Sequence, residues 1–546
     1  MTVNKWSLMR RARQEQDAEA ITLRESKVAF ESRPVMKPYR SPPDSTTQRR
    51  WRGAVFAGVI FFCLFQGLAF AFLAPYLPMF FAFPLVVLGG LVVWSLPDSD
   101  RAPVKWIEGC FFALFVSMVL WPNYLAIAIP GFPWLTMVRL TGFPMVFGLL
   151  VAVSQSPGFR AKMAEVLSAT PWLWKALVFF VAIQFFSIFL SKQVGQSVDK
   201  FIVAQVSWTA MYFVGVYVFS KPGRVELWAS LLCGMIAVLG LIAVVETRHH
   251  QVPWAHHIPS FIKINSPVVD AILAGSSRSY TDIYRTQSTF ETSLDFGEYI
   301  ALTVAFFYSF LFGKYRQFTK IMALILIGVA FVSSYLTHSR SSALGCMVAS
   351  MLWLLAWGVL QWRNSRQSLF GPSVVLVYPI LGVLVLAATL FIGRIRNVIW
   401  GGGETVSSTE SRVEQWRMGR EILLHNPIGH GIGRAAETLN FHQPGGLLTI
   451  DSWFLSALLE YGVVGFIVFF GMIVIAVSYA FGALWRARVL DLEISFLIPA
   501  AISLVIFVLV RLILSSELNF PIAFMLLGMI NALVYRSKAA PAAISA

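Results

Sequence analysis

The sequence has 546 residues, of which 57% are hydrophobic and only 13% are charged. Soluble domains carry about twice that charged fraction, and apolar stretches of bilayer-spanning length recur along this chain. The composition excludes an ordinary soluble domain and predicts an all-α, polytopic integral membrane protein. The net charge of +15 lies mainly in a basic tail and in short loops, so we do not expect nucleic acid as a partner.

Residues 1–52 are polar and basic and include the segment RPVMKPYRSPPD, which predicts an extended or disordered cytoplasmic tail without a cleavable signal peptide. The membrane domain follows over residues 53–536, and residues 537–546 form a cytoplasmic C-terminal tail. Basic residues at alternate span ends orient the chain with both termini inside. We expect about 14 spans, starting near residues 53, 79, 107, 137, 172, 201, 225, 298, 321, 342, 373, 452, 494 and 519.

Two loops on the outer side are long, at about residues 246–297 and 394–451. Loops longer than about 15 residues in compact proteins are usually functional or disordered. These two are rich in Trp, Arg, His and Gly, which favours ordered structure. All four cysteines fall inside expected spans, so neither a disulfide framework nor a metal site is expected.

Arginines gather on this outer side, against the usual bias of positive charge toward the cytoplasm. Arg340 lies between two apolar stretches in SYLTHSRSSALGCM, close to His338, and Arg278 and Arg285 precede the eighth span. A guanidinium offers planar donors suited to phosphate oxygens, so a bound anion explains the cluster. Two alternatives stay open: Arg340 as an anchor that snorkels to the interface, and Arg278 and Arg285 as ordinary loop cations.

A helix with basic and aromatic residues is predicted in RVEQWRMGREILLHNPIGHGIG. Arg412, Trp416 and Arg420 recur at i, i+4 and i+8, with Arg417 beside them. The proline and glycines of HNPIGHGIG must end this helix. It is placed either to contact the anion or to lie on anionic lipid headgroups.

The segment TIDSWFLSALLEYGVVGF places Asp451 at the start of the twelfth span and Glu460 within it. Asp451 is placed to take a proton from an attacking hydroxyl or to cap the helix. Glu460 is either a buried hydrogen-bonded residue or a member of the site. Arg511 and Glu517 flank another outer turn and are placed to pair with each other. An anionic lipid held beside a base is typical of glycosyl transfer from a lipid diphosphate.

Over residues 280–470 the sequence resembles the O-antigen ligases and the O-antigen or exopolysaccharide polymerases. The resemblance rests on the order and spacing of YRTQSTFETSLDFGEYIAL, HSRSSALG, RVEQWRMGREILLHNPIGHGIG and DSWFLSALLEYGVVGF. It implies a glycosyltransferase of the multi-span C type in the bacterial inner membrane, with two long periplasmic loops and its active site facing the periplasm. It also implies an undecaprenyl-diphosphate-linked glycan as donor, and no metal or other cofactor.

By the same resemblance, Arg340 and Arg285 fall on the family's diphosphate-binding arginines. The family's histidine, proposed to activate the acceptor hydroxyl, falls on Asp451 here, and His442, nine residues upstream, is the alternative base. The expected catalytic residues are therefore Asp451, Arg340 and Arg285. The expected substrate-binding residues are Arg278, Arg412, Trp416, Arg417, Arg420, His442 and His338.

The expected function is polysaccharide polymerisation, in which a growing glycan is joined to another lipid-linked repeat. An O-antigen ligase with a lipid A core acceptor is the alternative in the same class. A lipid-linked oligosaccharide flippase or a secondary transporter is a second class, but this chain shows no evident internal repeat. The expected partners are the lipid-linked glycan, the glycan acceptor, membrane lipids and other polysaccharide-assembly proteins.

Overall fold

The computed structural model describes most of the chain from residue 88 onward. The described residues are 53–54, 57–58, 60–61, 64, 88–95, 98–99, 102–128, 135–264, 284–364, 369–391, 393, 406–442, 448–486 and 491–544. Arg278, the tail 1–52 and most of the first two expected spans lie outside them. The chain divides into two compact units, residues 1–104 with 148–165 and residues 105–147 with 166–546, and each is described by itself.

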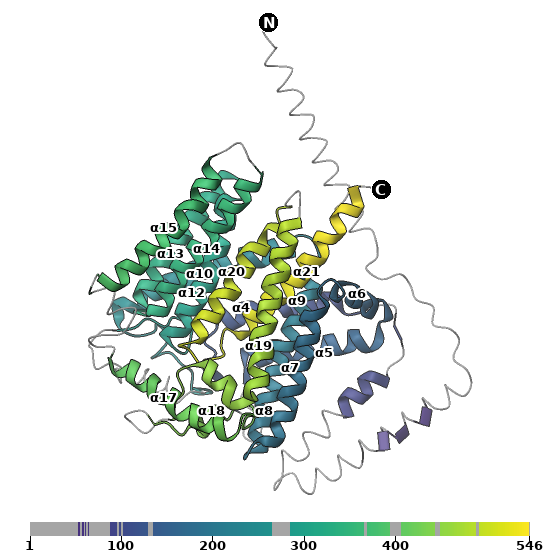
Figure 1. Ribbon diagram of the computed structural model, residues 1–546. Helices are drawn as coiled ribbons and strands as arrows, with labels where there is room; N and C mark the ends of the chain where they lie inside the picture. The colour runs from purple at the N-terminus through teal and green to yellow at the C-terminus, as the bar shows by residue number, and fades with distance from the viewer. Residues whose placement is uncertain are drawn as a thin grey trace. The chain divides into compact units, whose positions relative to one another are not determined.

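Helices make up most of the described chain (Figure 1). Their bounds are α4 (Val104–Leu120), α5 (Met137–Gln155), α6 (Pro157–Leu167), α7 (Pro171–Ser187), α8 (Val194–Ala204), α9 (Ala210–Phe219), α10 (Arg224–His249), α12 (Ser293–Phe312), α13 (Gln317–Leu336), α14 (Arg340–Asn364), α15 (Phe370–Phe391), α17 (Val406–His425), α18 (Ala435–Leu439), α19 (Trp453–Arg486), α20 (Leu497–Arg511) and α21 (Phe520–Ile544). A π-helical turn, Gln205–Thr209, joins α8 to α9.

Ten helical segments within the described residues are long and apolar enough to cross a membrane. They occupy the spans expected from residue 137 onward, except the one near residue 373. The span expected near residue 373 corresponds to α15, and the one expected near residue 107 corresponds to α4, with 17 residues. The protein is therefore a polytopic helical membrane protein, and the expected number of 14 spans stays a prediction beside the ten found among the described residues.

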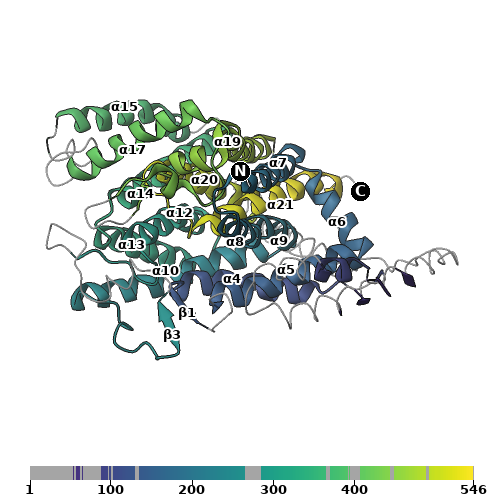
Figure 2. The ribbon, with the colours of Figure 1, turned by 90° about the horizontal axis from the view of Figure 1, so that it is seen from below.

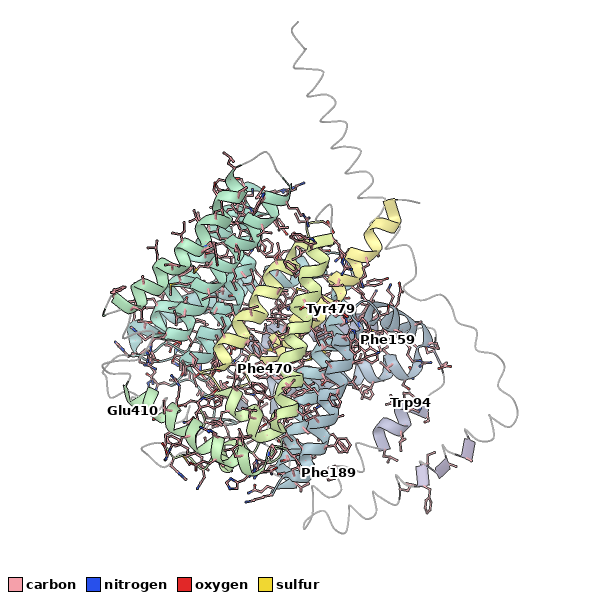
Figure 3. The ribbon with its side chains drawn as sticks, in the orientation of Figure 1. Trp94, Phe159, Phe189, Glu410, Phe470 and Tyr479 are labelled. Carbon is pink, nitrogen blue, oxygen red and sulfur yellow. The ribbon has the colours of Figure 1, made fainter. Side chains whose placement is uncertain are left out.

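Large apolar side chains are exposed along the outside of the spans in the second unit. Examples are Phe179, Phe189 and Phe481, which are exposed by 53%, 70% and 62%; Phe189 is labelled in Figure 3. A soluble protein rarely exposes so many large apolar side chains on one surface. This surface is suited to contact with lipid tails, where helices satisfy their backbone hydrogen bonds internally.

The first unit is small in its described part. Ser99 donates its backbone N–H to the carbonyl of Gln155 at 2.7 Å, and Ser154 donates its hydroxyl to the carbonyl of Val93. Arg160 on α6 lies 3.7 Å from a carboxylate oxygen of Asp98. These contacts join the segment that precedes α4 to the end of α5 and the start of α6.

Helix α12 is the centre of the second unit, and α10, α13, α14 and α20 pack around it (Figure 2). Close packing against α14 requires small side chains. A Cβ atom on Gly297 would lie 2.7 Å from Cβ of Ser342, and one on Gly345 would lie 2.7 Å from Cβ of Ala301. The small residues of the HSRSSALG segment thus allow α14 to approach α12.

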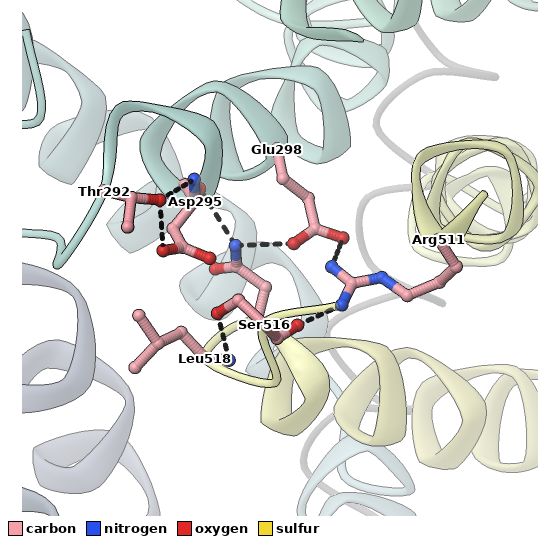
Figure 4. Close-up of polar contacts among 7 residues, drawn as sticks. Thr292, Asp295, Glu298, Arg511, Ser516 and Leu518 are labelled. Carbon is pink, nitrogen blue, oxygen red and sulfur yellow. Dashed lines mark hydrogen bonds and ion pairs between the residues drawn. The ribbon is translucent and has the colours of Figure 1, made fainter. Parts of the chain in front are cut away.

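A buried polar cluster joins α12 to α20 and α21 (Figure 4). Arg511 forms an ion pair with Glu298, and both side chains are 0% exposed. The amide of Asn519 donates to Glu298 Oε2 and to the carbonyl of Asp295, both at 2.9 Å. Arg511 also donates to the carbonyl of Ser516. Because the charges are opposite and hydrogen-bonded, they can be tolerated away from water.

The expected pairing of Arg511 with Glu517 is wrong. Arg511 turns inward to Glu298, whereas Glu517 pairs with Lys200 of α8 at 2.6 Å. Their nearness in sequence suited a local pair, but each side chain pairs with a residue of another helix. Neither long-range partner is visible from sequence spacing alone.

A small antiparallel sheet, which the all-α expectation missed, joins two loops. Strand β1 (Leu125–Ile127) lies between β2 (Leu135–Thr136) and β3 (Ile262–Ile264), in the order β2-β1-β3. Ala126 is opposite Thr136 in the register. Strands of two or three residues are too short for an alternating pattern to show in the sequence.

The two ends of the helices in the second unit differ in their contacts. We call the end that carries residues 121–128, 135–136, 284–292, 337–339, 426–442, 448–452 and 512–519 the site end. Hydrogen bonds tie these loops together: Thr289 to Val119 at 2.7 Å, Thr286 to Leu336 at 3.2 Å and Ser515 to Ile450 at 2.5 Å. At the other end, cations pair with carboxylates: Lys221 and Arg224 with Glu108, and Arg536 with Glu493.

Candidate active site

Arg340 is the first residue of α14, directly after the short turn that follows α13. The hydroxyl of Ser339 accepts the N–H of Ser342 at 3.4 Å, which caps the new helix. Packing and capping therefore account for the serines around Arg340 but not for the arginine itself. A cation at a helix N-terminus opposes the helix dipole, at a cost of roughly 0.3–1 kcal/mol.

Two further arginines lie close to Arg340. Arg285, from the segment before α12, and Arg412, from α17, both act electrostatically on its guanidinium. Arg285 is exposed, and Arg340 and Arg412 are partly buried. Three cations and a helix N-terminus thus converge at the site end, where each repels the others. An anion bound between them would relieve that repulsion.

Glu246 of α10 holds the segment that carries Arg285. Its carboxylate accepts the hydroxyl of Tyr284 at 2.9 Å and the backbone N–H groups of Gln287 and Ser288 at 2.9 and 2.7 Å. Ser288 has a positive φ of 53°, so the chain turns sharply around the carboxylate. This role is not visible in the sequence, because a lone glutamate near a helix end resembles an ordinary surface residue.

Helix α17 turns one side toward α19 (Figure 1). Gln415 and Gly419 are buried there, and a Cβ atom on Gly419 would lie 2.5 Å from Cδ1 of Leu455. The Nε of Arg412 is buried on the same side and has no hydrogen-bond partner among the residues that the structure describes. That N–H is a donor available to an anion.

The other residues expected on α17 point elsewhere. Trp416, Arg417 and Arg420 are exposed, and Arg417 makes two hydrogen bonds with Glu414, at 2.6 and 2.9 Å. The i, i+4, i+8 pattern predicted Arg412, Trp416 and Arg420 on one face of the helix. In the structure Arg412 is partly buried, whereas Trp416 and Arg420 are exposed. Only Arg412 joins the arginines at Arg340.

Asp451 lies beside Arg412, two residues before α19. Its backbone N–H donates to Gln415 Oε1 at 2.9 Å, and the amide of Gln415 donates back to Asp451 Oδ2 at 3.3 Å. Burial raises the pKa of the Asp451 carboxyl, while the charge of Arg412 and the hydrogen bond from Gln415 partly offset that rise. A carboxylate with a raised pKa is a stronger base toward a hydroxyl.

The two expected histidines are both exposed. His338 has a positive φ of 47°, and its ring lies 5.6 Å from that of Tyr335. His442 is exposed and forms an isolated β-bridge with Leu448. Residues 443–447, which follow His442, lie outside the described residues. Arg278, the remaining expected contact, is also outside them.

The segment after α17 docks into a break in α19, as its glycines require. Gly462 has φ 69° and ψ −174°, and a Cβ atom there would lie 2.3 Å from the carbonyl oxygen of Ile428. The backbone N–H of His430 donates to the carbonyl of Leu459 at 2.8 Å. The backbone N–H of Gly431 donates to the backbone carbonyl of Glu460 at 3.2 Å. This junction fixes the end of α17 against the first part of α19, and so places Arg412 relative to Asp451.

Residues 325–470 match the family described as O-Antigen ligase. This match covers less than half of the chain, and over it the sequence is similar to that family. A comparison with curated proteins finds no match. The matched segment runs from within α13 to the middle of α19 and contains Arg340, Arg412 and Asp451. Arg285 and Glu246 lie outside the match and come to the site through the contacts described above.

Proposed function

We propose that the protein is an inverting glycosyltransferase of the outer leaflet of the bacterial inner membrane. It transfers a glycan from an undecaprenyl-diphosphate-linked donor to an acceptor hydroxyl. The observation that supports this is the convergence of Arg285, Arg340 and Arg412 beside Asp451, within and next to the matched segment. The basic groups at the opposite end support a cytoplasmic placement of that end and of both termini.

In this proposal the three arginines bind the diphosphate and offset the charge that grows as it leaves. Asp451 accepts the proton of the acceptor hydroxyl. The acceptor oxygen then bonds to the anomeric carbon from the face opposite the diphosphate. The bond between that carbon and the phosphate oxygen breaks, and its electron pair stays with the lipid diphosphate. The anomeric configuration is inverted.

Within this class we propose polymerisation, with a second lipid-linked repeat as acceptor. The aspartate at the position of the family's histidine supports a departure from the ligase reaction. Ligation to a lipid A core is the alternative. A reconstitution with purified protein and lipid-linked repeats tests the class: longer lipid-linked glycans and free undecaprenyl diphosphate are expected. If the donor is only moved across a vesicle membrane without release of diphosphate, the protein is a transporter instead.

The substitution Asp451→Asn is expected to lower the turnover number about 100-fold or more, because the amide keeps the shape but cannot accept the proton. The wild-type rate should rise with pH through the raised pKa of Asp451, since the base must be ionised. Both are measured by release of lipid diphosphate at saturating substrate. Unchanged turnover in Asp451→Asn, together with a loss in His442→Gln, would transfer the role of base to His442.

The substitution Glu246→Gln is expected to lower kcat/KM for the lipid-linked donor about tenfold while the acceptor KM stays unchanged. In the variant, the buried backbone N–H of Gln287 or Ser288 faces the NH2 group of the new glutamine and loses its acceptor. This loss costs roughly 1–3 kcal/mol and displaces the segment that carries Arg285. Steady-state kinetics with each substrate varied in turn measure the effect. The matched control is Glu226→Gln, at the other end of α10. A loss of thermal stability with an unchanged donor dependence would make Glu246 a purely structural residue.

A further inference from the structure

A cavity of about 540 Å³ opens at the site end of the second unit, and none of the expected site residues lines it. This volume lies in the range of small-molecule sites, roughly 300–1,000 Å³. Segments far apart in the sequence enclose it. Its charged lining residues are Lys200, Glu291, Glu460 and Glu517, and its aromatic ones are Trp208 and Trp453. Hydroxyl and amide groups complete the wall, from Asn123, Thr136, Ser207, Ser456, Ser515 and Ser516.

Three carboxylates face a single ammonium in this cavity. The Nζ of Lys200 forms an ion pair with Oε2 of Glu517 at 2.6 Å. Oε1 of Glu460 accepts the backbone N–H of Ala435 at 3.4 Å. Glu291 makes no hydrogen bond or ion pair with any residue that the structure describes, although the charge of Lys200 acts on it. The Oδ1 atom of Asn123 is buried and also has no hydrogen-bond partner among the described residues. The cavity therefore offers acceptor oxygens.

This lining is unsuited to a phosphate and suited to a neutral polyol. An excess of carboxylates repels an anion, so the diphosphate of the donor belongs with the arginines. Carboxylates and amide oxygens accept hydrogen bonds from hydroxyl groups, and the rings of Trp208 and Trp453 add apolar atoms to the wall. A saccharide supplies both hydroxyl groups and apolar ring faces.

One short segment adjoins both the cavity and the residues beside Arg412. Ile450 lines the cavity, and its carbonyl accepts the hydroxyl of Ser515 at 2.5 Å. The next residue, Asp451, is bonded to Gln415 beside Arg412. A saccharide in the cavity would thus lie next to the proposed base.

We propose that this cavity binds the saccharide of the acceptor, with Glu291 as the main group that accepts its hydroxyls. The inference rests on the proposed function for the identity of the substrate as an acceptor. It assigns the two substrates to separate sites: the anionic lipid donor to the arginines on α14, α17 and the segment before α12, and the neutral acceptor to the carboxylates around Lys200.

The affinity for the saccharide should depend on pH. Burial, and next the charge of Asp295, raise the pKa of Glu291 to about 7, and Lys200 partly offsets the rise. The other charged groups that face it across the cavity are Glu460 and Glu517. Below pH 7 the carboxyl is protonated; above it, the carboxylate accepts stronger, charge-assisted hydrogen bonds. Saccharide affinity should therefore rise as the pH increases through about 7, and this rise should be smaller in Glu291→Gln.

Direct binding tests the proposal without turnover. The probe is a set of neutral oligosaccharides of one to three repeats cut from the polysaccharide of the host cell. Their binding to the full-length protein in detergent is measured by calorimetry for the wild type, Glu291→Ala and Glu437→Gln. Glu437 is an exposed carboxylate on α18 outside the cavity lining, so it is the matched control. Binding is expected to be about tenfold weaker in Glu291→Ala and unchanged in Glu437→Gln.

The outcomes separate this proposal from the proposed function. Equal binding by the wild type and Glu291→Ala, or no binding by the wild type, overturns the acceptor site even where release of lipid diphosphate depends on Arg340. Saccharide binding that depends on Glu291, without any release of lipid diphosphate by the wild type, supports the saccharide site and overturns the enzymatic function. In an active enzyme, Glu291→Ala should raise the acceptor KM about tenfold with the donor KM unchanged.

Discussion

Arg340→Lys should lower glycan transfer about 100-fold or more in a reconstituted assay, although the positive charge is kept. A lysine ammonium is a point charge and does not reproduce the planar fork of a guanidinium. The loss of one donor aimed at developing charge costs on the order of 10²–10³ in kcat. The neighbours Arg285 and Arg412 supply positive charge at the same place. The lysine variant should therefore lose the geometry of the hydrogen bonds rather than the charge, and the loss should appear in kcat more than in the donor KM.

The matched control for this substitution is Arg316→Lys. Arg316 is exposed at the N-cap of α13, at the opposite end of the helix that leads to Arg340. Its replacement should leave transfer and protein level unchanged. If Arg340→Lys and Arg340→Ala both retain wild-type turnover at normal protein levels, Arg340 is an interfacial anchor and does not act on the substrate.

Arg511→Met should produce the largest loss of stability among single substitutions at the site end. It leaves the Glu298 carboxylate fully buried without its ionic partner, and breaking such a pair typically costs about 3–5 kcal/mol. The rings of Phe507 and Phe520, 4.8 and 5.0 Å from the Arg511 guanidinium carbon, would also lose their cation. The change is measured as the midpoint of thermal unfolding in detergent.

A double substitution separates charge from shape at this cluster. Arg511→Met combined with Glu298→Gln removes both charges and should recover part of the lost stability, because the unpaired carboxylate is gone. Asn519 can still donate to the new amide oxygen in place of Glu298 Oε2. A single variant Arg511→Met that unfolds at the wild-type temperature would show that the ion pair does not hold α12 to α20.

Much of the helical framework follows from the sequence, because lipid imposes a simple rule of length and polarity. The spans expected near residues 225 and 321 begin within four residues of α10 and α13. The break in α19 was not foreseen, since Gly462 also suits close helix packing. Its reason lies in a distant segment: the carbonyl of Ile428 occupies the space that a Cβ atom would need.

The candidate site could likewise be predicted only in part. Arg340, Arg285 and Asp451 were expected from their local sequence and from the resemblance, and the structure brings Arg340 and Arg285 together with Arg412, which adjoins Asp451. Glu246 and Gln415, which position two of them, were not expected. Their roles are hydrogen bonds across more than thirty residues of sequence. The cavity around Lys200 was hidden for the same reason, because its walls come from separate helices and loops.

The most direct test of the account is the binding of undecaprenyl diphosphate to the purified protein, measured by native mass spectrometry with undecaprenyl monophosphate as competitor. The account predicts that the wild type retains the diphosphate in preference to the monophosphate. It also predicts that Arg340→Ala, Arg285→Ala and Arg412→Ala each weaken retention about tenfold or more, as expected for a lost charged hydrogen bond, while Arg316→Lys does not. Equal retention of the diphosphate by all of these variants would contradict the assignment of the arginines to the lipid diphosphate.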